Sequence, residues 1–400
     1  MKKILFLVII LLTLWGGWFA YNNLRGIGPA LRSAPRLPQI LQDNSSPDIP
    51  SQNTTGMPVM VPNGFSLHTF AQDLDGPRVL RWDPQGVLLV SIPGRGQVVA
   101  LPDANGDGKS DETIVVASGL RTPHGIAFYQ EKLYIAETDG VSVFDYSAGS
   151  RKASNKRKIV DLPAGGNHFS RTIDFGPDGK LYISVGSSCN VCIEKDSRRA
   201  KILVANSDGS GLRDYAAGLR NSVFFIWDTQ GRMMATDMGR DLIGDDIPPD
   251  EINIVEDGVF YGWPYCYGKK VWDRQFDDSS DARARCEASR GSHVDLQAHS
   301  APLGLRFIPQ SWGEEYAGDL LVSYHGSWNR SVPTGYKVVR VKLDEAGNYE
   351  ATEDFLTGWL GDAKGASGAY GRPVDILFDD AGAGYISDDK AGVIYQLKRM

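Results

Sequence analysis

Short apolar runs alternate with polar turns along most of the chain, and one motif recurs. In most copies an apolar run leads into a turn with Asp or Pro and usually Gly, and a second apolar run then ends in a polar loop. The copies lie at 81–91, 126–137, 173–186, 224–237, 305–326 and 376–389. Runs of this length and alternation predict β-strands. Their repetition predicts an all-β ring of blades whose loops surround one central mouth.

The first 24 residues differ from the rest and are typical of a signal peptide or membrane anchor. Lys2 and Lys3 precede residues 4–20, which carry no charge. That length lies between the apolar core of a signal peptide and a short membrane helix, and we favour an uncleaved anchor. The leading lysines then place the remainder outside the cytoplasm, in the periplasm or an equivalent compartment. Residues 25–58 predict a flexible tether, and residues 59–400 form the expected propeller domain.

Charge and cysteine content narrow the class of protein. The formal net charge is −7 and the pI is about 5.5, so no basic surface for nucleic acid is indicated. An even number of cysteines in an exported chain favours two disulfides, Cys189–Cys192 and Cys266–Cys286. The alternative for the first pair, a redox or zinc motif, lacks both an adjoining helix and a second CxxC.

Histidines and arginines near the motifs are the candidates for chemistry. His124 stands directly before the second motif and is our first choice as general base; a purely structural histidine is the alternative. His325 and His168 are further candidates. Arginines recur at related points of the repeat: Arg78, Arg121, Arg171, Arg220, Arg330 and Arg372. Directed at one cavity they would bind a multiply anionic ligand, although each could instead brace neighbouring blades by pairing with an acid.

Two segments could bind Ca²⁺, which prefers oxygen ligands. Residues 237–253 combine acids with glycines in one long loop. Residues 102–112 space four side chains like the start of a calcium loop, although a plain hairpin turn explains them equally well: Asp103, Asn105, Asp107 and Asp111. No phosphate-binding glycine loop, serine-hydrolase elbow or HExxH motif is present, so nucleotide cofactors and serine hydrolysis lose support.

Six segments together resemble a known family: RTPHGIAF, AAGLRNSVFF, DDIPPDEINIV, YGWPYCYG, HGSWNRSVPTGYKVVRV and YGRPVDILF. Across about residues 60–400 the chain resembles the soluble-type pyrroloquinoline quinone (PQQ)-dependent sugar dehydrogenases, the glucose and L-sorbosone group, and is closer to the sorbosone type. The resemblance implies a six-bladed β-propeller with PQQ across its mouth, held by Arg and Lys side chains and one Ca²⁺.

The resemblance also assigns roles to particular positions. His124 matches the catalytic base, and the backbone carbonyls of Gly239 and Arg240 match the calcium ligands. The expected cofactor-binding residues are Arg220, Asn221, Arg330, Tyr370 and Arg372. The family has Pro where Arg240 stands and Arg where Tyr370 stands. Pro123 replaces the Asp that precedes the base in glucose enzymes, which argues against glucose as the substrate.

The expected function is oxidation of an aldose or related sugar, dependent on PQQ and calcium, with electrons passing to a quinone or cytochrome. Two alternatives remain. A metal-dependent propeller lactonase or esterase would need carboxylates converging on one cation, and residues 241–251 could supply them. A non-catalytic binding scaffold would fit the departures at Tyr370 and Arg240.

Overall fold

The computed structural model describes residues 12–17, 50–363 and 365–400. Most of the expected anchor, residues 4–20, and most of the expected tether lie outside these ranges. Residues 12–17 are helical. Within the described ranges, no helix has the length and apolar character needed to span a bilayer.

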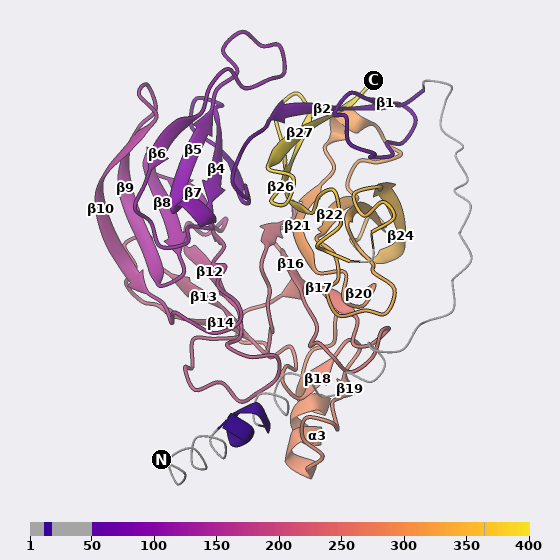
Figure 1. Cartoon of the computed structure of the whole chain (residues 1–400). Helices are drawn as coiled ribbons and strands as arrows, with labels where there is room; N and C mark the ends of the chain where they lie inside the picture. Colours follow the sequence, from indigo (N-terminus) through magenta and orange to yellow (C-terminus); the bar gives the residue numbers. More distant parts are fainter. Residues whose placement is uncertain (1–11, 18–49, 364) are drawn as a thin grey trace, which may run out of the picture.

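Six blades form a β-propeller (Figure 1): five are four-stranded antiparallel sheets, and the sixth has five strands, of which β1 pairs with β2 in parallel. The first five blades are β3(Leu80–Trp82), β4(Leu88–Ile92), β5(Gln97–Leu101) and β6(Ile114–Ala117); β7(Ile126–Tyr129), β8(Lys132–Glu137), β9(Gly140–Ser147) and β10(Lys152–Asp161); β11(Ile173–Phe175), β12(Leu181–Val185), β13(Lys201–Ala205) and β14(Arg213–Ala217); β15(Phe225–Trp227), β16(Met233–Asp237), β17(Asp250–Val255) and β20(Val294–Leu296); and β21(Pro302–Phe307), β22(Leu320–Tyr324), β23(Lys337–Leu343) and β24(Tyr349–Leu356). The expected all-β, six-bladed architecture is confirmed.

The sixth blade joins the two ends of the folded chain. It contains β25(Pro373–Phe378), β26(Gly384–Asp388) and β27(Val393–Arg399), completed by β2(Phe65–Ala71) and β1(Gln52–Asn53). Phe65 pairs with Arg399 across the antiparallel β2–β27 ladder, and Figure 1 shows these two strands side by side near the C-terminus. Asn53 Nδ2 donates to the carbonyls of Met57 at 2.9 Å and Val59 at 2.7 Å. The ordered fold therefore begins before residue 59, inside the expected tether.

The recurring motif is explained by the hairpin between the first two strands of a blade. Asp83 Oδ1 accepts hydrogen bonds from the backbone N–H groups of Gln85 and Val87, both at 2.8 Å. Gly86 closes the turn with φ 78°, a left-handed conformation that favours glycine. Asp228 forms the same turn with Gly231 in the fourth blade. The motif recurs where a hairpin uses this acceptor and glycine at fixed spacing; the β7–β8 hairpin instead turns through Gln130 and Glu131, both with positive φ.

The fourth blade carries an insertion between β17 and β20. It contains β18(Cys266–Tyr267), β19(Val271–Trp272) and α3(Ser280–Ala288), in which Ser279 caps the helix by accepting from Ala282 N. Short 3₁₀ turns occupy Pro93–Arg95 and Gln310–Trp312. The disulfide Cys266–Cys286 ties this helix to β18, and Cys189–Cys192 closes a loop after β12. Both expected disulfides are confirmed.

Candidate functional site

Loops from the third to the sixth blade enclose a cavity of about 400 Å³. Its wall combines imidazoles, guanidinium groups and carboxylates with one exposed indole. The lining residues that carry the argument are His168, Arg220, Asn221, Gly239, Asp241, Trp328, Asn329 and Arg372. Since they belong to different blades, the cavity depends on the closed ring for its shape.

His168 presents an imidazole whose hydrogen-bonding state is fixed. Its Nδ1 lies 2.9 Å from the carbonyl oxygen of Ser187 and 3.0 Å from the Ser187 hydroxyl. A carbonyl can only accept, so Nδ1 carries the hydrogen and Nε2 keeps its lone pair. Among the described residues none bonds to Nε2. Burial, and then the charge of Arg220, lower the pKa of His168 to about 3. The imidazole is therefore neutral at neutral pH, and its Nε2 carries a lone pair.

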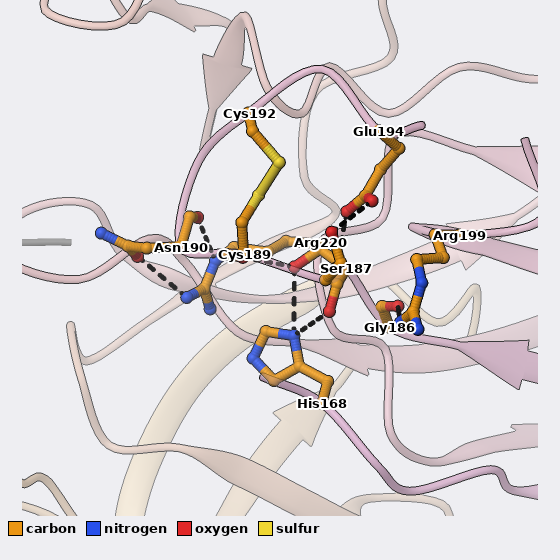
Figure 2. The surroundings of a disulfide bond; sticks show 10 residues. His168, Gly186, Ser187, Cys189, Asn190, Cys192, Glu194, Arg199 and Arg220 are labelled. Carbon is orange, nitrogen blue, oxygen red and sulfur yellow. Dashed lines mark hydrogen bonds between the residues drawn. A yellow bond between two sulfur atoms is a disulfide. The ribbon is translucent and has the colours of Figure 1, made fainter. Parts of the chain in front are cut away.

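One loop, residues 186–194, positions both His168 and Arg220; we call it the disulfide loop because Cys189–Cys192 closes it (Figure 2). The carbonyl of Asn190 accepts from Arg220 Nε at 2.9 Å, and Asn190 Oδ1 accepts from Nη2 at 3.0 Å. The Ser187 hydroxyl donates to the carbonyl of Cys189 at 2.8 Å, which orients it to accept from His168. The base and the cation are thus fixed by a single short segment.

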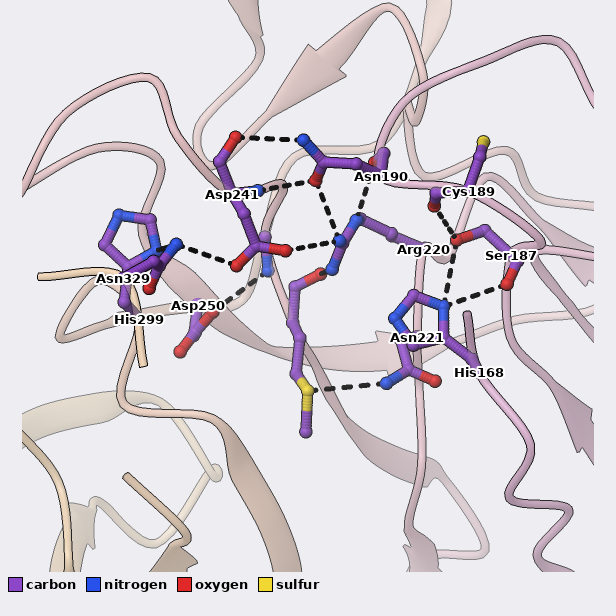
Figure 3. A network of polar contacts seen from close by, with 12 residues as sticks. His168, Ser187, Cys189, Asn190, Arg220, Asn221, Asp241, Asp250, His299 and Asn329 are labelled. Carbon is purple, nitrogen blue, oxygen red and sulfur yellow. Dashed lines mark hydrogen bonds and ion pairs between the residues drawn. The ribbon is translucent and has the colours of Figure 1, made fainter. Parts of the chain in front are cut away.

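The disulfide loop also fixes an acid at the cavity. Asn190 Oδ1 accepts from Asp241 N at 2.7 Å, and Asn190 Nδ2 donates to the Asp241 carbonyl at 3.1 Å (Figure 3). The Asp241 carboxylate pairs with Arg220 at 2.9 Å and accepts from Asn329 Nδ2 at 2.8 Å. Asp241, in a loop of the fourth blade, is therefore bonded both to Asn190 of the third blade and to Asn329 of the fifth.

The recurrence of arginine in the repeat has a backbone cause. In three blades the N–H of an arginine that precedes the first strand donates to an acid at the end of the second strand. The pairs are Arg121 with Glu137 at 2.7 Å, Arg220 with Asp237 at 2.9 Å and Arg372 with Asp388 at 2.7 Å. Burial raises the pKa of Asp237 to about 7 and that of Asp388 to about 6. Two of these three arginines line the cavity.

The two cavity arginines differ in the charge they offer. Arg220 forms an ion pair with Asp241, which offsets its charge. Arg372 donates from Nε to the His325 carbonyl at 2.9 Å and from Nη2 to the Gly326 carbonyl at 2.8 Å. It makes no ion pair with any residue that the structure describes. Because two carbonyls orient the guanidinium without neutralising it, Arg372 is suited to an anionic ligand.

His325 is already engaged and is the weaker candidate for a base. Its Nε2 lies 2.9 Å from Asp389, which also pairs with Arg78 at 2.5 Å. Burial lowers the pKa of His325 to about 4. Burial raises the pKa of Asp389, but the neighbouring His325, Arg78 and Arg372 together hold it below its ordinary value. His325 contributes through its carbonyl, which holds Arg372.

Two buried arginines support the segment that carries His168. Arg171 and Arg199 are 0% and 5% exposed, and neither pairs with an acid in the described ranges. Both donate to the carbonyl of Pro163, at 2.9 and 3.0 Å. Arg171 also donates to the carbonyl of His168 at 3.0 Å. Their charges help to keep the pKa of His168 low.

Three residues expected at the site lie elsewhere. His124 is fully buried and does not line the cavity; its Nδ1 lies 3.2 Å from the Thr172 hydroxyl, and its buried Nε2 has no hydrogen-bond partner among the described residues. Arg330 turns to Asp246, with which it pairs at 2.9 Å. Tyr370 is 54% exposed and does not line the cavity.

The two residues expected to bind calcium through their carbonyls, Gly239 and Arg240, have different surroundings. Gly239 lines the cavity, and a Cβ there would lie 2.7 Å from Pro248 Cγ, so a side chain would not fit. The neighbouring Arg240 side chain is buried and pairs with Asp273 at 2.5 Å, so the backbone alone could serve a cation. Among the described residues, one group of three His, Cys, Asp or Glu side chains is close enough to share a metal: Cys189, Cys192 and Glu194. Its two sulfurs already form a disulfide.

The second expected calcium segment is a self-contained turn. Asp103 accepts from the backbone of Gly106, Asp107 and Gly108, at 2.8, 3.1 and 2.9 Å. Asp111 accepts from Ala104 N at 2.6 Å and from Asn105 Nδ2 at 2.9 Å. Since Asp103 and Asp111 are engaged with the loop itself, the hairpin alternative accounts for the segment.

Sequence reasoning left several cavity residues without a role. Asn190 lies between Cys189 and Cys192, a spacing that predicts a disulfide and assigns no role to the asparagine. Asp241 was grouped with possible calcium ligands, and Trp328 and Asn329 lie in the quoted HGSWNR segment. After His124, the sequence offers His168 only as a further candidate. Its position directly before the third motif, after a Gly-Gly-Asn turn, was the available signal.

Comparison with known proteins gives the family. The sequence profile of the TrAA12-like family matches residues 59–400. An uncharacterised protein of Borreliella burgdorferi is 32% identical over 357 residues, covering 84% of this chain and 90% of that protein. A PQQ-dependent pyranose dehydrogenase of Coprinopsis cinerea is 27% identical, covering 85% of this chain. This chain spans 54% of the length of that fungal protein.

Solved structures agree with the sequence comparison. The holo PQQ domain of the Coprinopsis cinerea enzyme superposes with a TM-score of 0.74 at 26% identity, over 87% of this chain and 100% of that domain. The calcium structure of a Trichoderma reesei carbohydrate-active enzyme of family AA12 gives a TM-score of 0.73 at 19% identity, over 87% and 100% of the two chains. With its fold, its cavity and a profile match over nearly the whole propeller, this chain belongs to the TrAA12-like family, among relatives that are PQQ-dependent sugar dehydrogenases.

Proposed function

We propose that this protein oxidises an aldose or related pyranose sugar with PQQ as cofactor and His168 as general base. The observation that carries the proposal is the pairing, in one cavity, of a neutral imidazole with a free Nε2 and a guanidinium, Arg372, that has no acid partner among the described residues. PQQ is a tricarboxylate, so an arginine-lined cavity of about 400 Å³ suits it. Arg372 and Arg220 would hold its carboxylates.

Each residue of the site then has a physical task. When bound, PQQ supplies the carbon that accepts a hydride from the sugar. His168 Nε2 would accept the proton of the sugar hydroxyl, a contribution of about 10² to 10⁴ in rate. The Ser187 carbonyl keeps the lone pair on Nε2 throughout the approach of the substrate, because it holds the hydrogen on Nδ1. The disulfide loop keeps His168 and Arg220 at constant separation.

Calcium is part of the proposal through backbone oxygens. The carbonyls of Gly239 and Arg240, together with oxygens of the cofactor, would bind the ion, consistent with the preference of Ca²⁺ for oxygen ligands. In the described ranges no group of three carboxylate or imidazole side chains converges at the cavity. A hydrolase that depends on such a group is therefore the less favoured alternative.

The remaining expectations stay in the proposal. The two disulfides support a location outside the cytoplasm. We propose that this location is the periplasm and that residues 4–20 are the membrane anchor. Electrons would pass to a quinone or a cytochrome. The test of function is reconstitution: full-length protein is purified without cofactor, PQQ and Ca²⁺ are added, and binding is measured by equilibrium dialysis before sugar-dependent reduction of a dye. Binding without turnover on any aldose would support the scaffold alternative, and absence of binding would refute the proposal.

A further inference from the structure

Trp328 exposes its indole at the edge of the site cavity although both of its neighbours are buried. It is 67% exposed, whereas Ser327 is 3% and Asn329 is 7% exposed. Trp328 and Asn329 both line the cavity that contains His168. A large apolar side chain left in solvent at the edge of a binding cavity commonly marks a contact for a ligand.

The loop around Trp328 is held on both sides, so the exposure is a fixed feature. Ser327 N donates to the Thr334 carbonyl at 2.9 Å, and Thr334 N donates to the Ser327 hydroxyl at 2.9 Å. On the other side, Asn329 Nδ2 donates to Asp241 at 2.8 Å. With its backbone neighbours anchored, the indole is presented in one place, which reduces the conformational entropy lost when a ligand binds.

We propose that Trp328 and Asn329 form a subsite for the pyranose ring of the substrate, an inference that rests on the proposed function. The indole offers a flat apolar face, which suits the C–H face of a sugar ring. Asn329 Oδ1 is buried and has no hydrogen-bond partner among the described residues, so a sugar hydroxyl can supply the missing donor. A sugar ring offers both an apolar C–H face for the indole and hydroxyl donors for Asn329. Arg220, 4% exposed, lies deeper and would be covered first by the cofactor.

Kinetics of the PQQ-loaded full-length protein test the subsite. We expect Trp328→Ala to raise KM for an aldopyranose about 10-fold, with kcat changed less than about twofold and the Kd for PQQ unchanged. Trp328→Phe should recover part of the loss. Tyr349→Ala, which removes an aromatic side chain that is 42% exposed and outside the cavity, is the matched control. An unchanged KM, or a Kd for PQQ that weakens as much as KM, would overturn the proposal; the second result would place the indole on the cofactor.

A direct binding measurement separates this proposal from the proposed function. In cofactor-free protein with ¹⁵N-labelled indoles, the Trp328 signal is assigned by its loss in Trp328→Phe. We expect it to shift on titration with an aldopyranose, and not with an acyclic polyol of equal size. If PQQ does not bind but the indole shifts, the subsite stands while the redox function fails. If PQQ binds and the indole does not respond to sugar even in the loaded protein, the subsite is refuted alone.

Discussion

The Nδ1 atom of His168 lies 2.9 Å from the carbonyl oxygen of Ser187, and this contact determines which nitrogen of the imidazole can react. Ser187 belongs to the disulfide loop, whose Asn190 also holds Arg220 at 2.9 Å. The chemistry of the cavity therefore depends on a segment that need not itself touch the substrate.

Removing the disulfide of this loop should impair turnover more than folding. In Cys189→Ser/Cys192→Ser the loop loses its covalent closure, so His168 and Arg220 are positioned less well. We expect kcat to fall about 10- to 100-fold, since small displacements of catalytic groups have effects of this size. Steady-state kinetics measure it, with near-ultraviolet circular dichroism to confirm the fold. Cys266→Ser/Cys286→Ser is the control, expected to change thermal stability but not kcat. Equal kcat in wild type and the first variant would show that the loop is rigid without its disulfide.

Arg372 should control the affinity for an anionic cofactor. Its guanidinium is oriented by two carbonyls and shares no ion pair in the described part of the chain. Arg372→Ala should weaken PQQ binding about 10- to 100-fold, the range for a lost hydrogen-bonded charge, and Arg372→Lys should weaken it less. Arg330→Ala is the control, because Arg330 pairs with Asp246 and does not line the cavity. Equal losses in the two alanine variants, measured by equilibrium dialysis, would contradict this assignment.

The buried imidazole should make stability depend on pH. The pKa of His168 is about 3 in the folded protein, below its ordinary value near 6.5. Below pH 6.5 the His168 imidazole is therefore protonated in the unfolded chain but not in the folded one. The free energy of unfolding is unaffected by this group above pH 6.5 and decreases as the pH falls toward 3. Between pH 7.5 and 5 the cofactor-free wild type should lose about 2 kcal/mol more than His168→Gln. Chemical denaturation at both pH values measures the difference, and parallel losses in the two proteins would refute the lowered pKa.

Much of the fold could be predicted because its causes are local. Asp83 and Gly86 form a hairpin turn that needs no distant partner, and its repetition revealed the blades. Arg220 and Arg372 recur at one point of the repeat, as Arg121 does, and the family resemblance separates them from Arg121 as cofactor-binding residues. Histidines carry no such periodic signal. Whether His124 or His168 reaches the cavity depends on packing between blades, which a single sequence does not specify.

The position of Arg330 outside the cavity has a similar explanation. Its sequence position beside Trp328 suggested the cavity, yet Asp246, a residue distant in sequence, offers an ion pair at 2.9 Å. The sequence gives no sign of the role of Asn190, because that role comes from four hydrogen bonds with Arg220 and Asp241 that form only when the chain folds. Such long-range polar contacts are the part of the site that required coordinates.

The most direct test compares single turnovers of His168→Gln and His124→Gln after both have been shown to bind PQQ as the wild type does. Rapid mixing with an aldopyranose measures the rate of cofactor reduction in each. We predict a fall of about three orders of magnitude for His168→Gln and less than about threefold for His124→Gln. A near-normal rate in His168→Gln would contradict its role as the base, and a large loss confined to His124→Gln would return that role to the buried histidine.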